Sequence, residues 1–260
     1  MRIPTRDGIV INCDSSGQGP HLLLIHGTGA PGGRSRPVRS ALEAQFTVHA
    51  MDRRGHGKSG DASSYTIEQE YADIASCIDA FGPLPVDVIA HSYGAICALG
   101  AAQNGARIRR LVLYEPPIPA PGSSYCPPDV IPAMRAAIAR GDLPGAMTSF
   151  FTGVHGITLD NVARMHRVAA WREQCALAPL VLRELEAVGR FNFIPNDYAG
   201  WRIPTLLLLG GDSPPQHRAT AELLHATLPA SQIEILPGQT HNAINAAPKL
   251  FASAVLRFLS

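Results

Sequence analysis

The chain has 260 residues with a mass of 27.7 kDa, of which 46% are hydrophobic, and its 22 Lys and Arg nearly balance its 21 Asp and Glu. This length is enough to bury one sizeable core, so we expect a single domain with an insertion. The balanced charge argues against nucleic acid as a partner, and no stretch is long and apolar enough to cross a bilayer, so a small-molecule substrate is predicted, with no membrane partner.

The first residues and the cysteines add further expectations. The N-terminus M-R-I-P-T-R-D-G lacks the apolar stretch of a secretory signal, which predicts a cytoplasmic location. The five cysteines are odd in number and show no C-x-x-C spacing, which is typical of reduced packing residues. No cluster of His, Cys or carboxylates has metal-ligand spacing, so no metal and no organic cofactor is expected. The sequence leaves open whether the protein is a monomer or a homodimer.

In chain order, short β-branched or Leu-rich runs alternate with longer helical patterns. This alternation is typical of an α/β fold with a mostly parallel sheet and helices on both faces. The spacing of the apolar residues separates the two kinds of segment. The predicted strands are Ile9–Cys13, Leu22–His26, Phe46–Met51, Val86–Ala90, Arg110–Tyr114, Leu206–Gly210 and Ile233–Leu236, and the predicted helices between and after them are Ile67–Phe81, Tyr93–Asn104 and Pro248–Leu259.

Residues 116–200 break this rhythm. They begin with the proline-rich stretch P-P-I-P-A-P and then show helical patterns without strands. We therefore expect a core of residues 1–115 and 201–260 with residues 116–200 inserted as a helical cap, or lid, over the strand ends. A separate interaction domain is the less favoured alternative, because the insertion has few charged faces. The predicted helices are Val130–Arg140, Leu143–Phe151, Leu159–Gln174 and Leu177–Val188.

The strongest chemical signal is the segment A-H-S-Y-G at residues 90–94, between a predicted strand and a predicted helix. A serine at such a sharp turn has strained backbone geometry, and it needs small neighbours so that the strand and the helix can approach each other. Ala90 and Gly94 meet that need, although alanine replaces the first glycine of the usual G-x-S-x-G. This context predicts that Ser92 is a nucleophile, whereas a serine that only caps a helix is the simpler reading.

With these residues the chain resembles the α/β-hydrolase family, from about Gly8 to its C-terminus. The motifs H-G-T-G at 26–29, D-R-R-G-H-G-K-S at 52–59 and P-G-Q-T-H at 237–241 follow strands in the family's order. The resemblance implies an eight-stranded type of sheet with a helical lid. It also implies that His241 is the base of Ser92 and that the backbone N–H groups of Thr28 and Tyr93 form the oxyanion hole. A plain exposed loop histidine is the alternative for His241.

The third catalytic residue has two candidates. Most of the family carries the acid in a G-x-x-D turn after the strand predicted at Leu206–Gly210, but here Ser213 occupies that position and Asp212 comes one residue early. Another branch, which includes the haloalkane dehalogenases, carries a glutamate at the end of the preceding strand, where this chain has Glu115. We favour Glu115, because a carboxylate among apolar residues and prolines needs a partner. Asp212 remains the alternative acid.

Two motifs of other families are also present in part. Residues 27–32 satisfy G-x-G-x-x-G, but glycine and proline at 33–37 interrupt the helix that a dinucleotide site requires. The segment G-K-S at 57–59 resembles the end of a P-loop, but the earlier glycine of that motif is replaced by Asp52. Neither motif supports a nucleotide site.

A serine nucleophile implies acyl chemistry. We expect hydrolysis of a small, largely apolar ester, lactone or thioester through an acyl-enzyme. Hydrolysis of a C–C bond and lyase chemistry use the same residues and remain alternatives, as does a ligand receptor with vestigial hydrolase activity. Apolar side chains of the insertion either line an acyl pocket or form helix core; they are Met147, Phe150, Phe151, Met165, Trp171 and Leu177.

Overall fold

The computed structural model describes residues 1–30, 36–119 and 124–260. The chain divides into two compact units. The first, the sheet unit, comprises Met1–Gly27, Gly32–Pro117 and Asn192–Ser260. The second, the helical unit, comprises Thr28–Pro31 and Ile118–Phe191.

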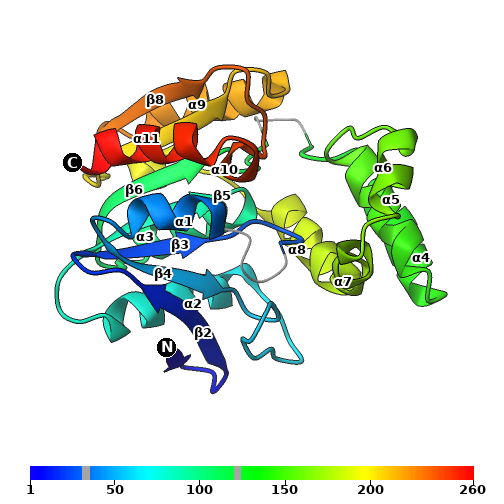
Figure 1. The fold of residues 1–260 in the computed structure, drawn as a ribbon, viewed down its shortest axis with the longest axis horizontal. Helices are drawn as coiled ribbons and strands as arrows, with labels where there is room; N and C mark the ends of the chain where they lie inside the picture. Colours follow the sequence, from blue (N-terminus) through cyan, green and yellow to red (C-terminus); the bar gives the residue numbers. More distant parts are fainter. Residues whose placement is uncertain (31–35, 120–123) are drawn as a thin grey trace. The chain divides into compact units, whose positions relative to one another are not determined.

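The sheet unit is built on an eight-stranded sheet with the order β1-β2-β4-β3-β5-β6-β7-β8 (Figure 1). Strand β2 pairs antiparallel with β1 and β4, and the strands from β4 to β8 run parallel. The predicted α/β fold class is therefore confirmed. The strands are β1 Arg2–Pro4, β2 Val10–Ser16, β3 His21–Ile25, β4 Thr47–Asp52, β5 Val86–His91, β6 Ile108–Tyr114, β7 Thr205–Gly210 and β8 Ser231–Leu236.

Helices cover both faces of this sheet. On one face, α1 and α11 pack together (Figure 1). The buried core cluster on this side includes Leu22, Ile89 and Val112. Because successive side chains of a strand point to opposite faces, the alternate strand residues meet the other helices, among them α3, which contacts β3, β5 and β6. The helices are α1 Arg36–Leu42, α2 Ile67–Ala80, α3 Tyr93–Gln103, α9 Pro215–Thr227, α10 Ala243–Ala246 and α11 Pro248–Leu259, with a 3₁₀ turn at Pro195–Tyr198.

The burial of the central strands leaves the edge of the sheet as the place for a polar site. Every residue of β5 and of β7 is buried, as expected for parallel strands covered on both faces. The side chains within these strands are therefore committed to packing. Polar residues at and just beyond the carboxyl ends of the strands, such as His91 at the end of β5, lie at the edge where α/β sheets bind ligands.

The helical unit has an apolar core of its own. Met147 and Phe150 of α5 pack with Trp171 of α7 and Val181 of α8 in one buried cluster, and Met165 and Leu177 lie partly buried against it. The apolar side chains considered for an acyl pocket therefore contribute to the core of this unit. Its helices are α4 Val130–Ala139, α5 Leu143–Gly153, α6 Leu159–Met165, α7 Ala170–Ala176 and α8 Ala178–Arg190.

The structure differs from the predicted elements in several places. The helix predicted at Leu159–Gln174 is two helices, α6 and α7, and the weakly periodic helices α1 and α9 were not predicted. A short helix does follow the glycine-rich loop, because Pro37 is tolerated in its first turn. Residues 31–35 of that loop and 120–123 of the proline-rich stretch lie outside the described residues. Within the predicted cap of residues 116–200, the helical unit includes only Ile118–Phe191, so it covers fewer residues of this stretch. Its role as a lid stays a prediction.

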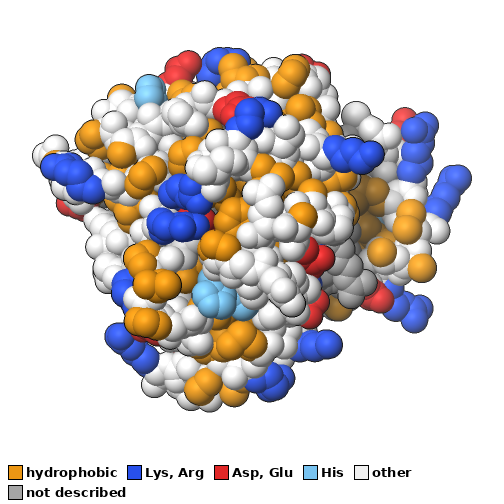
Figure 2. All heavy atoms as spheres, turned by 60° about the vertical axis from the view of Figure 1, so that its left-hand side comes forward, with side chains coloured by type: hydrophobic (Ala, Val, Ile, Leu, Met, Phe, Trp, Pro, Cys, Tyr) orange, Lys and Arg blue, Asp and Glu red, His pale blue; other side chains and the backbone are white. Residues whose placement is uncertain are grey.

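The surface of the protein mixes charged and apolar side chains. On the face drawn in Figure 2, basic and acidic side chains lie scattered among hydrophobic and other groups. Among the described residues, no helix has the length and apolar character needed to span a membrane. All five cysteines are free thiols, and four of them are buried.

Candidate active site

Ser92 lies in a strained turn between β5 and α3. Its φ of 53° and ψ of −126° place it outside the regions that residues with a side chain usually adopt. The turn is closely packed: a Cβ on Gly94 would lie 2.4 Å from the His26 carbonyl oxygen, and one on Gly27 would lie 2.7 Å from the Ser92 Cβ. Glycine is therefore required at both places, and the His26–Gly27 backbone lies directly against the serine turn.

Glu115 follows β6 and is the only other described non-glycine residue with a positive φ, at 47°. Its side chain is buried, and the Oε1 atom accepts hydrogen bonds from the Gly210 N–H at 2.8 Å and the Ser213 hydroxyl at 2.5 Å. The Oε2 atom lies 2.7 Å from Nδ1 of His241. The strained backbone thus directs this carboxylate toward the turn after β7 and toward the histidine.

The contacts of Glu115 distinguish it from the alternative acid. Asp212 is exposed, and its backbone N–H donates to the Gln239 carbonyl at 2.9 Å. Ser213, which stands where most of the family carries the acid, instead donates to Glu115. Of the two carboxylates, Glu115 is the one that the structure brings to His241, and its catalytic role stays a proposal.

The protonation of Glu115 follows from the same contacts. Burial raises the pKa of this carboxyl, but the hydrogen bond with His241, the interactions with His217 and His241, and the hydroxyl of Ser213 outweigh burial, so the pKa lies below its ordinary value. The side chain is consequently a carboxylate at neutral pH. An anion at Oε2 favours the tautomer of His241 that carries its hydrogen on Nδ1.

The loop that carries His241 is fastened by groups on β5 and β6. Nε2 of His91, the residue before Ser92, donates to the His241 carbonyl oxygen at 2.9 Å, and the two rings lie with centroids 4.6 Å apart. The Tyr114 hydroxyl donates to the Thr240 carbonyl oxygen and accepts from the Ala243 N–H. These bonds hold the His241 loop at the end of the strand that leads into Ser92.

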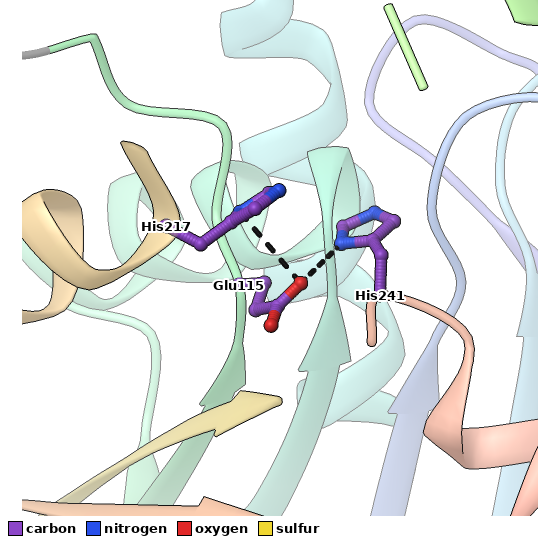
Figure 3. Close-up of side chains that lie close together, drawn as sticks. All are labelled: Glu115, His217 and His241. Atoms are coloured by element: carbon purple, nitrogen blue, oxygen red, sulfur yellow. Dashed lines mark hydrogen bonds and ion pairs between the residues drawn. The ribbon is translucent and has the colours of Figure 1, made fainter. Parts of the chain in front are cut away.

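A third side chain of this cluster was not predicted from the sequence. His217 in the first turn of α9 stacks on His241 with ring centroids 5.0 Å apart, and its Nδ1 lies 3.7 Å from Oε2 of Glu115 (Figure 3). Burial lowers the pKa of His217 to about 4, although Glu115 acts in the opposite direction. His217 is therefore neutral at physiological pH.

The same three side chains are also a possible metal donor set. Glu115, His217 and His241 each offer one ligand atom, and these atoms lie within 4.8 Å of one another. Two imidazoles and a carboxylate suit transition metals. The carboxylate already pairs with His241 through a 2.7 Å hydrogen bond, as the proposed catalytic arrangement requires.

The two predicted oxyanion donors differ in how far the structure describes them. Tyr93 is buried and is the first residue of α3, so its N–H belongs to a helix N-terminus, where anions are stabilised. Thr28 belongs to the helical unit by its contacts, whereas Gly27 belongs to the sheet unit. Both donor roles stay predictions.

A mostly parallel eight-stranded sheet with a serine in a strained strand-to-helix turn is the architecture of an α/β hydrolase. The model of the "Alpha/beta hydrolase family" matches residues 22–254, and the chain belongs to this family. The protein is accordingly a hydrolase, as the sequence predicted.

Similar proteins include both esterases and other hydrolases. A solved structure of an alpha/beta hydrolase from Sphaerobacter thermophilus is 35% identical with a TM-score of 0.89, and the alignment covers 100% of both chains. The chain is also similar to 2-(acetamidomethylene)succinate hydrolase of Mesorhizobium japonicum, at 23% identity over 96% of this chain and 92% of that protein. The similarity to pimeloyl-[acyl-carrier protein] methyl ester esterase of Chromobacterium violaceum is 32% over only 38% of each chain, well under half of that relative's length.

Proposed function

We propose that this hydrolase cleaves a small, largely apolar ester, lactone or thioester through an acyl-enzyme on Ser92. The observation that carries the proposal is the 2.7 Å contact between Nδ1 of His241 and the buried Glu115 carboxylate, in a loop that His91 ties to the strand before Ser92. An imidazole whose Nδ1 hydrogen faces a carboxylate presents the lone pair of its second nitrogen as a base.

The proposed reaction has two halves. Nε2 of His241 removes the proton of the Ser92 hydroxyl while Oγ attacks the carbonyl carbon, and the negative charge moves to the carbonyl oxygen, facing the N–H groups of Thr28 and Tyr93. The protonated His241 then gives its proton to the leaving group as the bond to the carbonyl carbon breaks. Water attacks the acyl-enzyme in the same manner and releases the acid and the free Ser92.

The relatives support this chemistry. One of them is named a methyl ester esterase and another a hydrolase of an acetamidomethylene succinate. Both names describe hydrolysis, and a serine nucleophile with a histidine base is suited to hydrolysis at a carbonyl carbon. The preference for a small apolar acyl group rests on the sequence and is part of the proposal.

A fluorophosphonate probe tests the nucleophile. We expect one adduct per chain, located on Ser92 by peptide mass spectrometry, and a loss of at least about 10³-fold in kcat for p-nitrophenyl ester hydrolysis in Ser92→Ala. Ser64→Ala, at an exposed serine, is the matched control and should keep full turnover. Retained turnover in Ser92→Ala would refute the mechanism.

The ester series also separates the proposal from its rivals. A ligand receptor with vestigial activity should release about one equivalent of p-nitrophenol and then stop, whereas the proposed enzyme should show continuous steady-state release. Turnover of a vinylogous 1,5-diketone with no turnover of any ester would favour C–C bond hydrolysis instead.

A further inference from the structure

A buried guanidinium lies beneath the serine turn. Arg53 follows β4 in the D-R-R-G-H-G-K-S loop, and its side chain is fully inaccessible to solvent. Its Nη1 pairs with Oε1 of Glu70, which is equally buried on α2, at 2.7 Å. Such a pair offers little stability compared with apolar side chains of similar volume, because both charges must lose their water. Its other contacts therefore indicate what the charge does.

The first set of contacts holds the His26–Gly27 backbone. Nε of Arg53 donates to the His26 carbonyl oxygen at 3.0 Å, and Nη2 donates to that of Gly27 at 3.4 Å. The backbone N–H of Arg53 donates to Nε2 of His26 at 3.1 Å, so the ring hydrogen of His26 is on Nδ1, which donates to the Gly27 carbonyl at 2.8 Å. The Gly27 carbonyl thus accepts two hydrogen bonds.

Fixing this carbonyl also fixes a donor. The Gly27 carbonyl and the Thr28 N–H belong to one planar trans peptide and point in opposite directions. Hydrogen bonds to the carbonyl therefore set the direction of the N–H, and the positive charge of Arg53 polarises the same peptide group.

The second set of contacts reaches the other proposed donor. The guanidinium carbon of Arg53 lies 4.9 Å from the centre of the Tyr93 ring. The Tyr65 hydroxyl donates to Oε1 of Glu70 at 3.0 Å, so at the 2.7 Å contact between the two tyrosine hydroxyls it is Tyr93 that donates. A closed ring of contacts therefore joins Arg53, Glu70, Tyr65 and Tyr93, and the last of these is the first residue of α3.

We propose that Arg53 is a positioning residue for the oxyanion hole. Its Nη2 holds the Gly27–Thr28 peptide through the Gly27 carbonyl, and the face of its guanidinium group contacts the Tyr93 ring, so one buried side chain aligns both donors. This inference rests on the proposed function. It assigns Arg53 no contact with the substrate, and it requires that loss of Arg53 weakens the tetrahedral state more than the bound substrate.

The decisive comparison uses two pairs of buried charges. Arg53→Met with Glu70→Leu removes the pair at the serine turn, and Arg54→Met with Asp73→Leu removes the neighbouring buried pair, in which Arg54 binds Asp73 at 2.7 Å. Each double variant loses one fully buried ion pair, and the Arg54 variant also loses the partly exposed pair of Arg54 with Asp7. A merely structural effect should therefore lower the Tm and activity of the Arg54 variant at least as much as those of the Arg53 variant.

We expect kcat for an ester to fall by about 10- to 100-fold in the Arg53 pair variant with KM within about threefold, and to stay within about threefold in the Arg54 pair variant. The Ki of a trifluoromethyl ketone, which forms an oxyanion on Ser92, should rise by the same factor as kcat falls. The Ki of a substrate-shaped amide, which stays in the ground state, should not change.

Two further variants keep the proposal open to refutation if the double variant fails to fold. Arg53→Lys keeps the charge but loses the fork, and its kcat should lie at least about fivefold below that of the wild type. Tyr65→Phe removes the hydroxyl between Tyr93 and Glu70 and should lower kcat by about two- to fivefold. A wild-type kcat in Arg53→Lys, or equal losses in the two double variants, overturns the positioning role.

The same data separate this inference from the proposed function. If Ser92→Ala is inactive and the fluorophosphonate labels Ser92, but the Arg53 variants keep wild-type kcat, only the positioning role fails. If Ser92→Ala keeps its activity, the acyl-enzyme mechanism fails and the role of Arg53 fails with it.

Discussion

Two clusters of buried charge flank the serine turn, and they differ in whether their charge can change. The histidine–carboxylate cluster consists of Glu115, His217 and His241, and an imidazole is a group that can take up and release a proton, as the proposed mechanism requires of His241. The arginine–carboxylate cluster consists of Arg53, Glu70 and Tyr65, and its guanidinium stays charged at every pH at which the protein folds. We therefore expect the pH dependence of kcat/KM to come from one side of Ser92 only.

The largest expected effect is in the acid of the histidine–carboxylate cluster. Glu115→Gln should lower kcat/KM by about 10³- to 10⁴-fold, because an amide no longer fixes the Nδ1 hydrogen of His241 or stabilises its cation. Asp212→Asn is the matched control, and its exposed side chain should keep turnover within about twofold. Loss of activity in Asp212→Asn alone would move the acid to that residue.

A smaller effect is expected at His217. His217→Phe keeps a ring against His241 but removes the nitrogen near Glu115, so kcat should fall by about three- to tenfold. The unfolded chain protonates this histidine below its ordinary pKa of 6.5, whereas the folded protein does so only near a pKa of about 4. Between these values the unfolded state holds more protons, so the free energy of unfolding decreases as the pH falls.

Urea unfolding at pH 7 and pH 4.5 measures this contribution. The loss of stability on acidification should be smaller in His217→Phe than in the wild type, by about 3 kcal/mol at most. An unchanged loss would mean that His217 is not held neutral in the folded protein.

The smallest effect on activity is expected at His49, which is buried on β4 and bonded to Ser15 and His21. Burial, and next the charge of His21, lower the pKa of His49 to about 4. His49 therefore lowers the free energy of unfolding of the protein on acidification over the same pH range as His217. His49→Gln should reduce that loss and leave kcat at pH 7.5 within about twofold. If the kcat of His49→Gln fell as far as that of His217→Phe, the effect on catalysis would not be specific to the histidine–carboxylate cluster.

The features predicted from the sequence are those with local patterns. The α/β alternation and the A-H-S-Y-G turn each lie in one short segment, and the structure has the strand, turn and helix there as expected. Glu115 was favoured because a carboxylate follows an apolar strand, and the structure has its carboxyl group against His241.

The features that were missed depend on distant contacts. His217 lies on a helix with a weak apolar pattern, and its partners Glu115 and His241 come from two other segments. His91 directly precedes Ser92 in the sequence, but no local pattern indicates that its ring contacts His241, which lies 150 residues further along the chain. The start of α9 carried one usable signal, since Pro215 suits the first turn of a helix.

The place of the buried carboxylate in the chain has an evolutionary consequence. With the acid on Glu115, the proposed nucleophile and acid and Arg53 are all encoded before Ile118–Phe191, and His241 is encoded after it. This stretch can therefore be exchanged by recombination among relatives without carrying any of these four side chains with it. Changes within this stretch of the gene leave the codons of these four residues untouched.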